Sequence, residues 1–241
     1  MTNLMGEFLG TMVLIVFGCG VVANVLLKKS KAEGAGWIVI TFGWGIGVIM
    51  GVFTAVATGA PQADLNPAVT LAKMMIGTYT APHAVTTMVA ELAGAFVGAV
   101  IVWLAFLPHW EITEDKGAKL GVFCTAPAIR SFPANIVCEI IGTMALIIPI
   151  FAIFSKGVGG IAPGFGPYLV GFLVVGIGLS LGGPTGYAIN PARDLGPRLA
   201  HFVLPIAGKG GSDWEYSWVP VVGPLVGGGL AYFVGKAVGL I

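Results

Sequence analysis

Apolar residues run along this chain in long blocks rather than alternating with polar ones. A helix needs roughly 20 apolar residues to cross a hydrocarbon core about 30 Å thick. Six blocks approach this length, and they predict spans at about residues 4–27, 36–58, 84–107, 134–154, 166–181 and 218–238. An even number of spans places both ends of the chain on the same side of the membrane.

Two further apolar pieces, 66–76 and 190–203, are about half as long as a span. Each begins with Asn-Pro-Ala, a sound helix start because asparagine caps the first turn and proline fits the first helical position. Irregular backbone is tolerated at membrane depth only where it lines a water-filled cavity or is buried in protein. The pattern therefore predicts two re-entrant half-helices beside a pore.

The two halves of the chain match each other. The motif Glu7-Phe8-Leu9-Gly10-Thr11 opens the first span, and Glu139-Ile140-Ile141-Gly142-Thr143 opens the fourth. Each half then contains three spans with one half-helix after its second span. Because three is odd, the second half is inverted relative to the first, so the half-helices enter from opposite faces. Interrupted apolar segments at corresponding places in two halves mark a transport site.

These patterns predict an all-α membrane protein with six transmembrane helices, two re-entrant half-helices and an inverted internal repeat. We expect a single channel domain over residues 1–241. Its halves, about 1–108 and 132–241, are joined by a polar loop over 109–131 that lies in water. Glycines at four-residue spacing, as at Gly94 and Gly98, indicate helices that approach closely in lipid.

Composition supports a lipid environment and excludes several classes of function. Hydrophobic residues make up 56% of the chain and charged residues 10%, with a mean hydropathy of +0.94, whereas soluble domains carry about 25% charged residues. A net charge of +1 argues against a nucleic-acid partner. The three cysteines show no metal or disulfide spacing, and no nucleophile with a base or His-Glu-x-x-His motif is present. We expect no metal, no cofactor and no enzymatic activity.

Two Asn-Pro-Ala motifs in the matching gaps of an inverted repeat, the second followed by Arg193-Asp194, give a specific resemblance. Over nearly its whole length the chain resembles the aquaporin superfamily. Half-helices that meet head to head point their positive dipole ends at each other, and the Asn66 and Asn190 amides would donate into the lumen. This arrangement favours neutral solutes over cations and protons. The motif residues are Asn66, Pro67, Ala68, Asn190, Pro191 and Ala192.

The resemblance implies an outer constriction formed by Trp44, Gly178, Tyr187 and Arg193. Glycine at 178, where water-selective members usually carry histidine, indicates the glycerol branch. An aromatic corner suits the carbon backbone of a polyol, and the arginine takes its hydroxyls. Two structural alternatives stay open: Arg193 pairs with Asp194, or Trp44 is an interfacial tryptophan.

Carbonyl acceptors are expected from the extended strands that enter the half-helices, at Gln62, Ala63, Asp64, Thr185, Gly186 and Tyr187. Unwound backbone needs hydrogen-bond partners, so we expect Glu7 and Glu139 to brace these strands, and Glu91 in the same way. A proton relay is the alternative role for them. Asp64 and Tyr187 depart from the family, which commonly has histidine and, in the glycerol branch, phenylalanine at these positions.

The function expected from this resemblance is passive conduction of glycerol, water and other small uncharged solutes such as dihydroxyacetone. A facilitator of protonated lactic acid, a water-selective channel and an ion-coupled transporter are the alternatives; the last needs intramembrane carboxylates that face a substrate. The resemblance also implies a homotetramer embedded in the lipid of the cell membrane.

The orientation of the chain has two conflicting indications. The resemblance implies cytoplasmic termini. The lysine cluster Lys28, Lys29 and Lys31 lies on the opposite side, and the positive-inside rule would place that side in the cytoplasm. We expect the orientation of the family.

Overall fold

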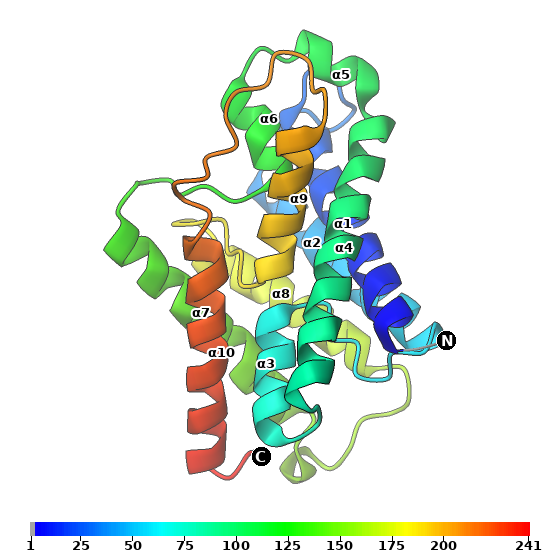
Figure 1. Cartoon of the computed structure of the whole chain (residues 1–241), viewed down its shortest axis with the longest axis vertical. Helices are drawn as coiled ribbons and strands as arrows, with labels where there is room; N and C mark the ends of the chain where they lie inside the picture. Colours follow the sequence, from blue (N-terminus) through cyan, green and yellow to red (C-terminus); the bar gives the residue numbers. More distant parts are fainter. Residues whose placement is uncertain (1–2) are drawn as a thin grey trace.

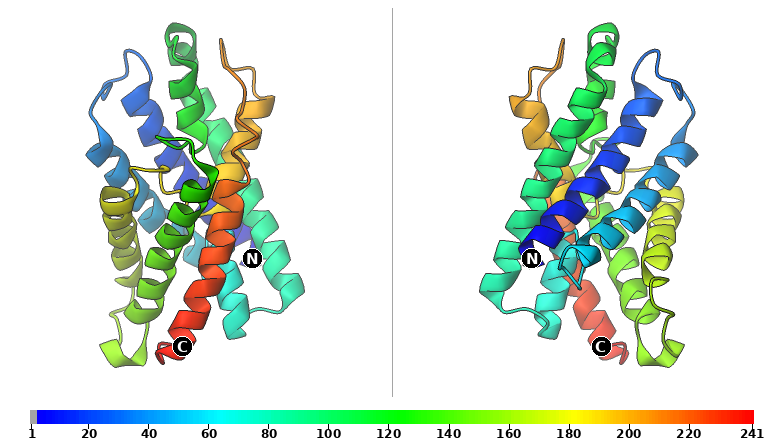
Figure 2. Two further views of the ribbon diagram at one scale, coloured as in Figure 1. Left: turned by 90° about the vertical axis from the view of Figure 1, so that its left-hand side faces the viewer. Right: turned by 90° about the vertical axis from the view of Figure 1, so that its right-hand side faces the viewer.

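The computed structural model of the chain describes residues 3–241, which fold into helices and loops with no strand among them. Figures 1 and 2 show a bundle elongated along the helix axes, in which α1 begins and α10 ends toward the same end. The span-like helices are α1 (Asn3–Leu26), α2 (Trp37–Ala57), α4 (Ala81–Ala105), α7 (Phe132–Ile153), α8 (Gly166–Leu181) and α10 (Val219–Ala237). The predicted all-α membrane fold is confirmed.

The predicted spans agree with these helices to within a few residues. Five of them, α1, α2, α4, α7 and α10, are long and apolar enough to cross a membrane. The fifth predicted span, α8, has 16 residues, about 24 Å at 1.5 Å per residue. It packs against α2 and α7, so it holds in the second half the place that α2 holds in the first.

The half-helices α3 (Pro67–Ile76) and α9 (Pro191–Val203) lie end to end along the long axis of the bundle (Figure 1). Their N-termini meet in the middle of the molecule. Each packs on the last long helix of the other half, α3 on α10 and α9 on α4. The inverted repeat is therefore interlocked, since each half-helix packs against helices of both halves.

Close helix packing depends on the glycines at four-residue spacing. An added Cβ would come within 3.0 Å of a neighbouring helix at every one of Gly43, Gly47, Gly51, Gly94, Gly98, Gly223 and Gly227. Several of these contacts are with backbone, as at Gly51, where the nearest helix atoms include the carbonyl of Gly10. In lipid, where burial between helices gives no net hydrophobic gain, this close approach supplies the dispersion contacts that hold a bundle together.

The polar connection between the halves differs from the prediction. It contains α5 (Leu107–Ile112) and α6 (Lys116–Phe123) instead of lying wholly in water. Helix α6 packs against α1 and α9, and Trp110, Phe123 and Lys119 are buried. The Lys119 ammonium donates to the carbonyl of Ala207, so its charge is compensated in the packed loop. The remaining short element is the 3₁₀ turn η1 (Lys156–Val158).

Candidate functional site

The N-termini of the half-helices are joined by reciprocal hydrogen bonds. The Asn66 amide nitrogen donates to the carbonyl of Ile189 at 2.8 Å, and the Asn190 amide nitrogen donates to the carbonyl of Leu65 at 2.7 Å. Each acceptor carbonyl belongs to the residue immediately before the other asparagine. The two motifs predicted from the sequence therefore meet in space.

Helix capping fixes the orientation of both asparagine side chains. The Asn66 side-chain oxygen accepts from the backbone N–H of Ala68, and that of Asn190 accepts from Ala192 and Arg193. Pro67 and Pro191 occupy the first helical position, where a missing N–H costs nothing. Since an amide nitrogen carries two hydrogens and one is used across the interface, one donor remains on each asparagine.

The strands that enter the half-helices have a matching, strained backbone. Ala63 and Leu65 have positive φ angles of 45° and 53°, and Tyr187 and Ile189 have 38° and 44°. Residues other than glycine rarely adopt this left-handed conformation, and it persists only where its surroundings enforce it. Its recurrence three residues and one residue before each asparagine shows that both strands are folded in the same special way.

Two buried glutamates satisfy the amides of these strands. The Glu7 carboxylate accepts from the N–H groups of Asp64 and Leu65, both at 2.9 Å. The Glu139 carboxylate accepts from Ala188 at 3.0 Å and Ile189 at 2.8 Å. Both carboxylates are therefore hydrogen-bonded to the backbone of their own half.

In the first half, a further buried glutamate, Glu91, accepts from the backbone at the start of α3. Glu91 on α4 is fully buried and accepts from the backbone N–H of Asn66 at 3.0 Å and from the Thr70 hydroxyl at 2.8 Å. The same Thr70 oxygen lies 2.9 Å from the Asp64 carboxylate, so the single hydroxyl hydrogen is shared between the two carboxylates. The start of α3 is thus tied to α4 as well as to α1.

A cavity of about 440 Å³ runs past the point where the half-helices meet. Eight of the residues predicted from the sequence for the pore line it, namely Trp44, Gln62, Ala63, Asp64, Asn66, Tyr187, Asn190 and Arg193. Ala188 and Ile189, which were not predicted, also line it. Gly178, Thr185 and Gly186 do not contribute to its lining. The acceptor strand of the second half therefore meets the cavity nearer to Asn190 than expected.

Arg193 lies against the indole of Trp44. Its guanidinium carbon is 4.0 Å from the ring centroid, close enough for a cation–π interaction. The guanidinium also donates to the carbonyl of Phe123 at 3.5 Å, a long contact. Gly18 on α1 makes room for the indole, since a Cβ there would collide with the ring. Neither Phe123 nor Gly18 was predicted; both act through shape or backbone, which leaves no motif to find.

Tyr187 fills the space beside Gly178. A Cβ on Gly178 would lie 2.8 Å from the Tyr187 ring carbon Cζ and 2.9 Å from its hydroxyl oxygen. Trp37 packs edge-on against the tyrosine with ring centroids 5.8 Å apart, and its indole nitrogen donates to the carbonyl of Gly178 at 2.9 Å. The glycine therefore admits the aromatic ring, which in turn lines the cavity.

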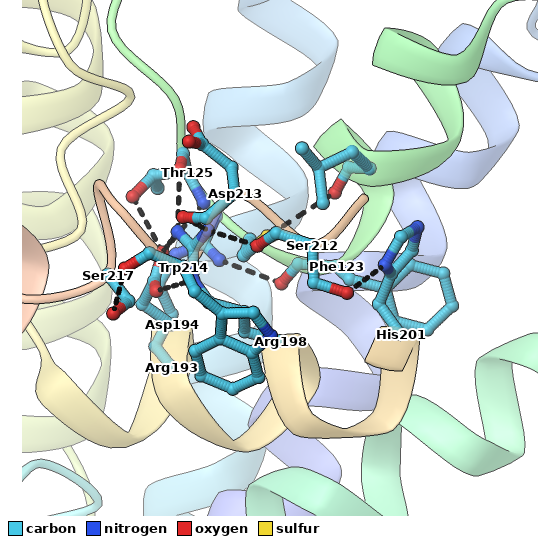
Figure 3. A network of polar contacts seen from close by, with 12 residues as sticks. Phe123, Thr125, Arg193, Asp194, Arg198, His201, Ser212, Asp213, Trp214 and Ser217 are labelled. Carbon is cyan, nitrogen blue, oxygen red and sulfur yellow. Dashed lines mark hydrogen bonds and ion pairs between the residues drawn. The ribbon is translucent and has the colours of Figure 1, made fainter. Parts of the chain in front are cut away.

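Asp194 anchors a loop through a network of polar contacts (Figure 3). It does not line the cavity. It accepts from the backbone N–H and the hydroxyl of Thr125, each at 2.8 Å, and pairs with Arg198 at 2.8 Å. Arg198 in turn donates to the carbonyls of Thr125, Ser212 and Asp213. The structural pair of this carboxylate is thus Arg198, and Arg193 is left to the cavity.

An ion pair on the surface continues this network. Arg130 and Asp213 form two contacts, at 3.0 Å and 2.5 Å. Hydrogen bonding to this carboxylate raises the pKa of the Arg130 guanidinium above its usual value. The loops that carry Thr125, Arg130 and Asp213 are therefore fastened to each other and to α9.

Comparison with known proteins finds relatives that match nearly the whole chain. The model of the family described as Major intrinsic protein matches residues 1–234. The chain is 55% identical over 228 residues to the "Probable glycerol uptake facilitator protein" of Thermotoga maritima, covering 95% of each chain. It is 53% identical over 228 residues to the "Glycerol uptake facilitator protein" of Bacillus subtilis, covering 95% of this chain and 81% of the relative.

A solved structure agrees with these relatives. The X-ray structure of the aquaglyceroporin from Plasmodium falciparum matches with a TM-score of 0.80 and 28% identity, covering 97% of this chain and 94% of the other. The resemblance predicted from the paired motifs is confirmed. The chain belongs to the major intrinsic protein family.

Proposed function

We propose that this chain is a passive channel that conducts glycerol, water and other small uncharged solutes across the cell membrane. The observation that carries the proposal is the cavity that runs past the meeting point of the half-helices. Arg193, Asn66 and Asn190 place hydrogen-bond donors along it, and apolar side chains such as Val48 and Val174 cover other parts of its wall. A polyol has a hydroxyl edge and a hydrocarbon edge, and this lining matches both.

Ion exclusion follows from the same geometry. The positive dipole ends of α3 and α9 face each other where the asparagines meet, and Arg193 adds a full charge near that point. A cation at this meeting point would lose water and face these positive groups. The donors also orient a water molecule by its oxygen, which opposes an unbroken chain of proton transfer.

Assembly, orientation and chemistry are further parts of the proposal. We propose a homotetramer in lipid with one channel in each subunit and with both termini in the cytoplasm. We assign no catalytic step to it. The roles proposed for the constriction residues Trp44, Gly178, Tyr187 and Arg193 are to set the width and polarity of the channel, and Glu7 and Glu139 hold its backbone.

The test is stopped-flow light scattering on proteoliposomes that contain the purified protein. We expect fast glycerol entry that is insensitive to proton and sodium gradients, with slower entry in Arg193→Ala. Flux that depends on a gradient would contradict a passive channel and favour an ion-coupled transporter. Fast water entry with glycerol excluded would identify a water-selective channel instead.

The same preparation tests the organic-acid alternative. Lactic acid entry measured at two pH values distinguishes the neutral acid from its anion, because only the concentration of the neutral acid increases as the pH falls. Entry of the neutral acid that is faster than glycerol entry would make the acid the preferred solute.

A further inference from the structure

The Thr70 hydroxyl lies between two buried carboxyl groups. Its oxygen is 2.8 Å from Oε1 of Glu91 on α4 and 2.9 Å from Oδ2 of Asp64, in the strand that enters α3. A hydroxyl group has one hydrogen to donate. If both carboxyl groups were ionised, one of these contacts would bring a lone pair of the hydroxyl against a negatively charged oxygen. A second hydrogen is therefore needed among the three side chains.

The two carboxyl groups differ in their other partners. Asp64 has a cationic partner, since it pairs with the Lys73 ammonium at 2.5 Å, and a buried charge is tolerated where it is paired. Glu91 accepts a single backbone N–H, that of Asn66 at 3.0 Å. Its other oxygen, Oε2, is buried and has no hydrogen-bond partner among residues 3–241.

The charged groups around Glu91 do not compensate for this deficit. Glu7 on α1 and Asp64 carry charge of the same sign as an ionised Glu91. Tyr79, just after α3, also faces this cluster and supplies no cation. Both Glu7 oxygens accept a backbone N–H, whereas Glu91 is fully buried with one oxygen unpaired. A buried carboxyl group that lacks partners for its charge is more stable when it is neutral.

We propose that Glu91 holds a proton in the folded protein and, as a neutral acid, positions Asn66. Its proton is donated to the Thr70 oxygen, and the Thr70 hydroxyl donates to Asp64. A distance of 2.8 Å fits donation in either direction, and this direction gives both short contacts a hydrogen. Oε1 of Glu91 still accepts from the N–H of Asn66, the residue whose side chain lines the cavity.

This inference rests on the proposed function and adds a positioning residue to it. Glu91 does not line the cavity, so its proton is held beside the channel and takes no part in conduction.

Infrared difference spectroscopy of the purified protein tests for the proton. A protonated carboxylic acid has a carbonyl stretching band at higher wavenumber than amide and carboxylate bands. At neutral pH we expect this band in the difference between the wild-type protein and Glu91→Gln. The matched control is Glu111→Gln, which replaces an exposed glutamate on α5 and should give no such band. Absence of the band from the Glu91→Gln difference would overturn the inference.

The pH dependence of unfolding in detergent gives a second measurement. A glutamate in an unfolded chain has a pKa of about 4.3, so above about pH 5 the folded protein would bind one proton more than the unfolded chain. Relative to Glu91→Gln, the unfolding equilibrium constant of the wild-type protein should then rise about tenfold per pH unit, until the infrared band disappears. Parallel pH profiles for the two proteins would contradict a held proton.

Glycerol and water entry into proteoliposomes test the positioning role. Glutamine is neutral and offers an acceptor oxygen and N–H donors, whereas leucine offers neither. We expect Glu91→Leu to lower glycerol entry several-fold more than water entry, and Glu91→Gln to restore the ratio toward that of the wild-type protein. Equal ratios in all three proteins would show that Glu91 does not position Asn66.

Size-exclusion chromatography checks the fold of each variant. If Glu91→Leu does not fold, the infrared and unfolding measurements on Glu91→Gln still decide whether the proton is held. A wild-type protein that conducts no glycerol would contradict the proposed function and leave the infrared result unaffected.

Discussion

Asn66 and Asn190 each donate a hydrogen bond to the carbonyl of the residue immediately before the other, at 2.8 Å and 2.7 Å. The two half-helices, one from each half of the chain, are therefore joined through their caps. Each asparagine side chain caps its own helix, donates to the opposite strand and lines the cavity. The meeting point of the repeat and part of the cavity wall are therefore built from the same two side chains.

Asn190→Asp separates these roles. Aspartate can still cap α9 by accepting from Ala192 and Arg193, but an ionised carboxylate donates nothing to the carbonyl of Leu65. Leaving this buried acceptor unpaired should lower the free energy of unfolding by about 1–3 kcal/mol. Glycerol entry should fall and potassium permeability should rise, because a donor is replaced by a negative charge.

Thermal unfolding in detergent and ion flux in proteoliposomes measure these effects. Asn24→Asp is the control, since Asn24 lies near the end of α1, away from the half-helices. Unchanged glycerol entry and potassium exclusion in Asn190→Asp would show that its amide donor is not needed in the channel.

Glu139→Gln tests the bracing of the second strand. A glutamine has one acceptor oxygen where the carboxylate has two, so one of the N–H groups of Ala188 and Ile189 loses its partner. We expect a loss of about 1–3 kcal/mol in the free energy of unfolding. Glu111→Gln, at an exposed position on α5, should have no measurable effect on the same unfolding curve. A proton relay would be favoured if Glu139→Gln kept its stability but altered proton-dependent flux.

Arg198→Ala should destabilise the protein far more than Arg130→Ala, although both remove an arginine from an ion pair. Arg198 is fully buried, and its loss leaves the Asp194 charge uncompensated, which costs about 3–5 kcal/mol. The Arg130 side chain is 43% exposed, so its pair with Asp213 contributes about 0–1 kcal/mol. Equal melting temperatures for the two variants would contradict the anchoring role of the buried pair.

The elements that the sequence predicted well are those set by local chemistry. Helix ends such as those of α3 and α9 follow from Asn-Pro caps, and the spans follow from hydropathy, since backbone in lipid must satisfy its own hydrogen bonds. The buried Lys119 shows the limit of this reasoning. The polar segment that contains Lys119 was predicted to lie in water. The carbonyl that accepts from its ammonium belongs to Ala207, 88 residues later in the sequence, and no local pattern encodes that partner.

The proposed constriction shows a second limit. Arg193, Trp44 and Tyr187 were predicted from the motif and the resemblance. Gly18 was missed, because it contributes only by having no side chain where the Trp44 indole lies. Asp64 was expected to supply a backbone carbonyl acceptor, and only the folded strand shows that its side chain pairs with the ammonium of Lys73 on α3.

Gly178→Ala should narrow the channel without touching its polar groups. The new Cβ would lie 2.8 Å from the Tyr187 ring and 2.8 Å from the Thr41 methyl group, so the tyrosine must shift, and the open direction is the cavity that it lines. Glycerol entry should therefore fall several-fold more than water entry, because the larger solute needs the full width.

The matched control is Gly176→Ala, two residues away on the same helix, where an added Cβ meets nothing within 4 Å. Both variants gain helix propensity of up to about 1 kcal/mol, so a difference between them reports the contact with Tyr187. Combining Gly178→Ala with Tyr187→Leu, which removes the ring, should restore glycerol entry toward the wild-type rate. If glycerol and water entry decline by the same factor in Gly178→Ala, the tyrosine does not set the width of the channel, and the constriction lies elsewhere along the cavity.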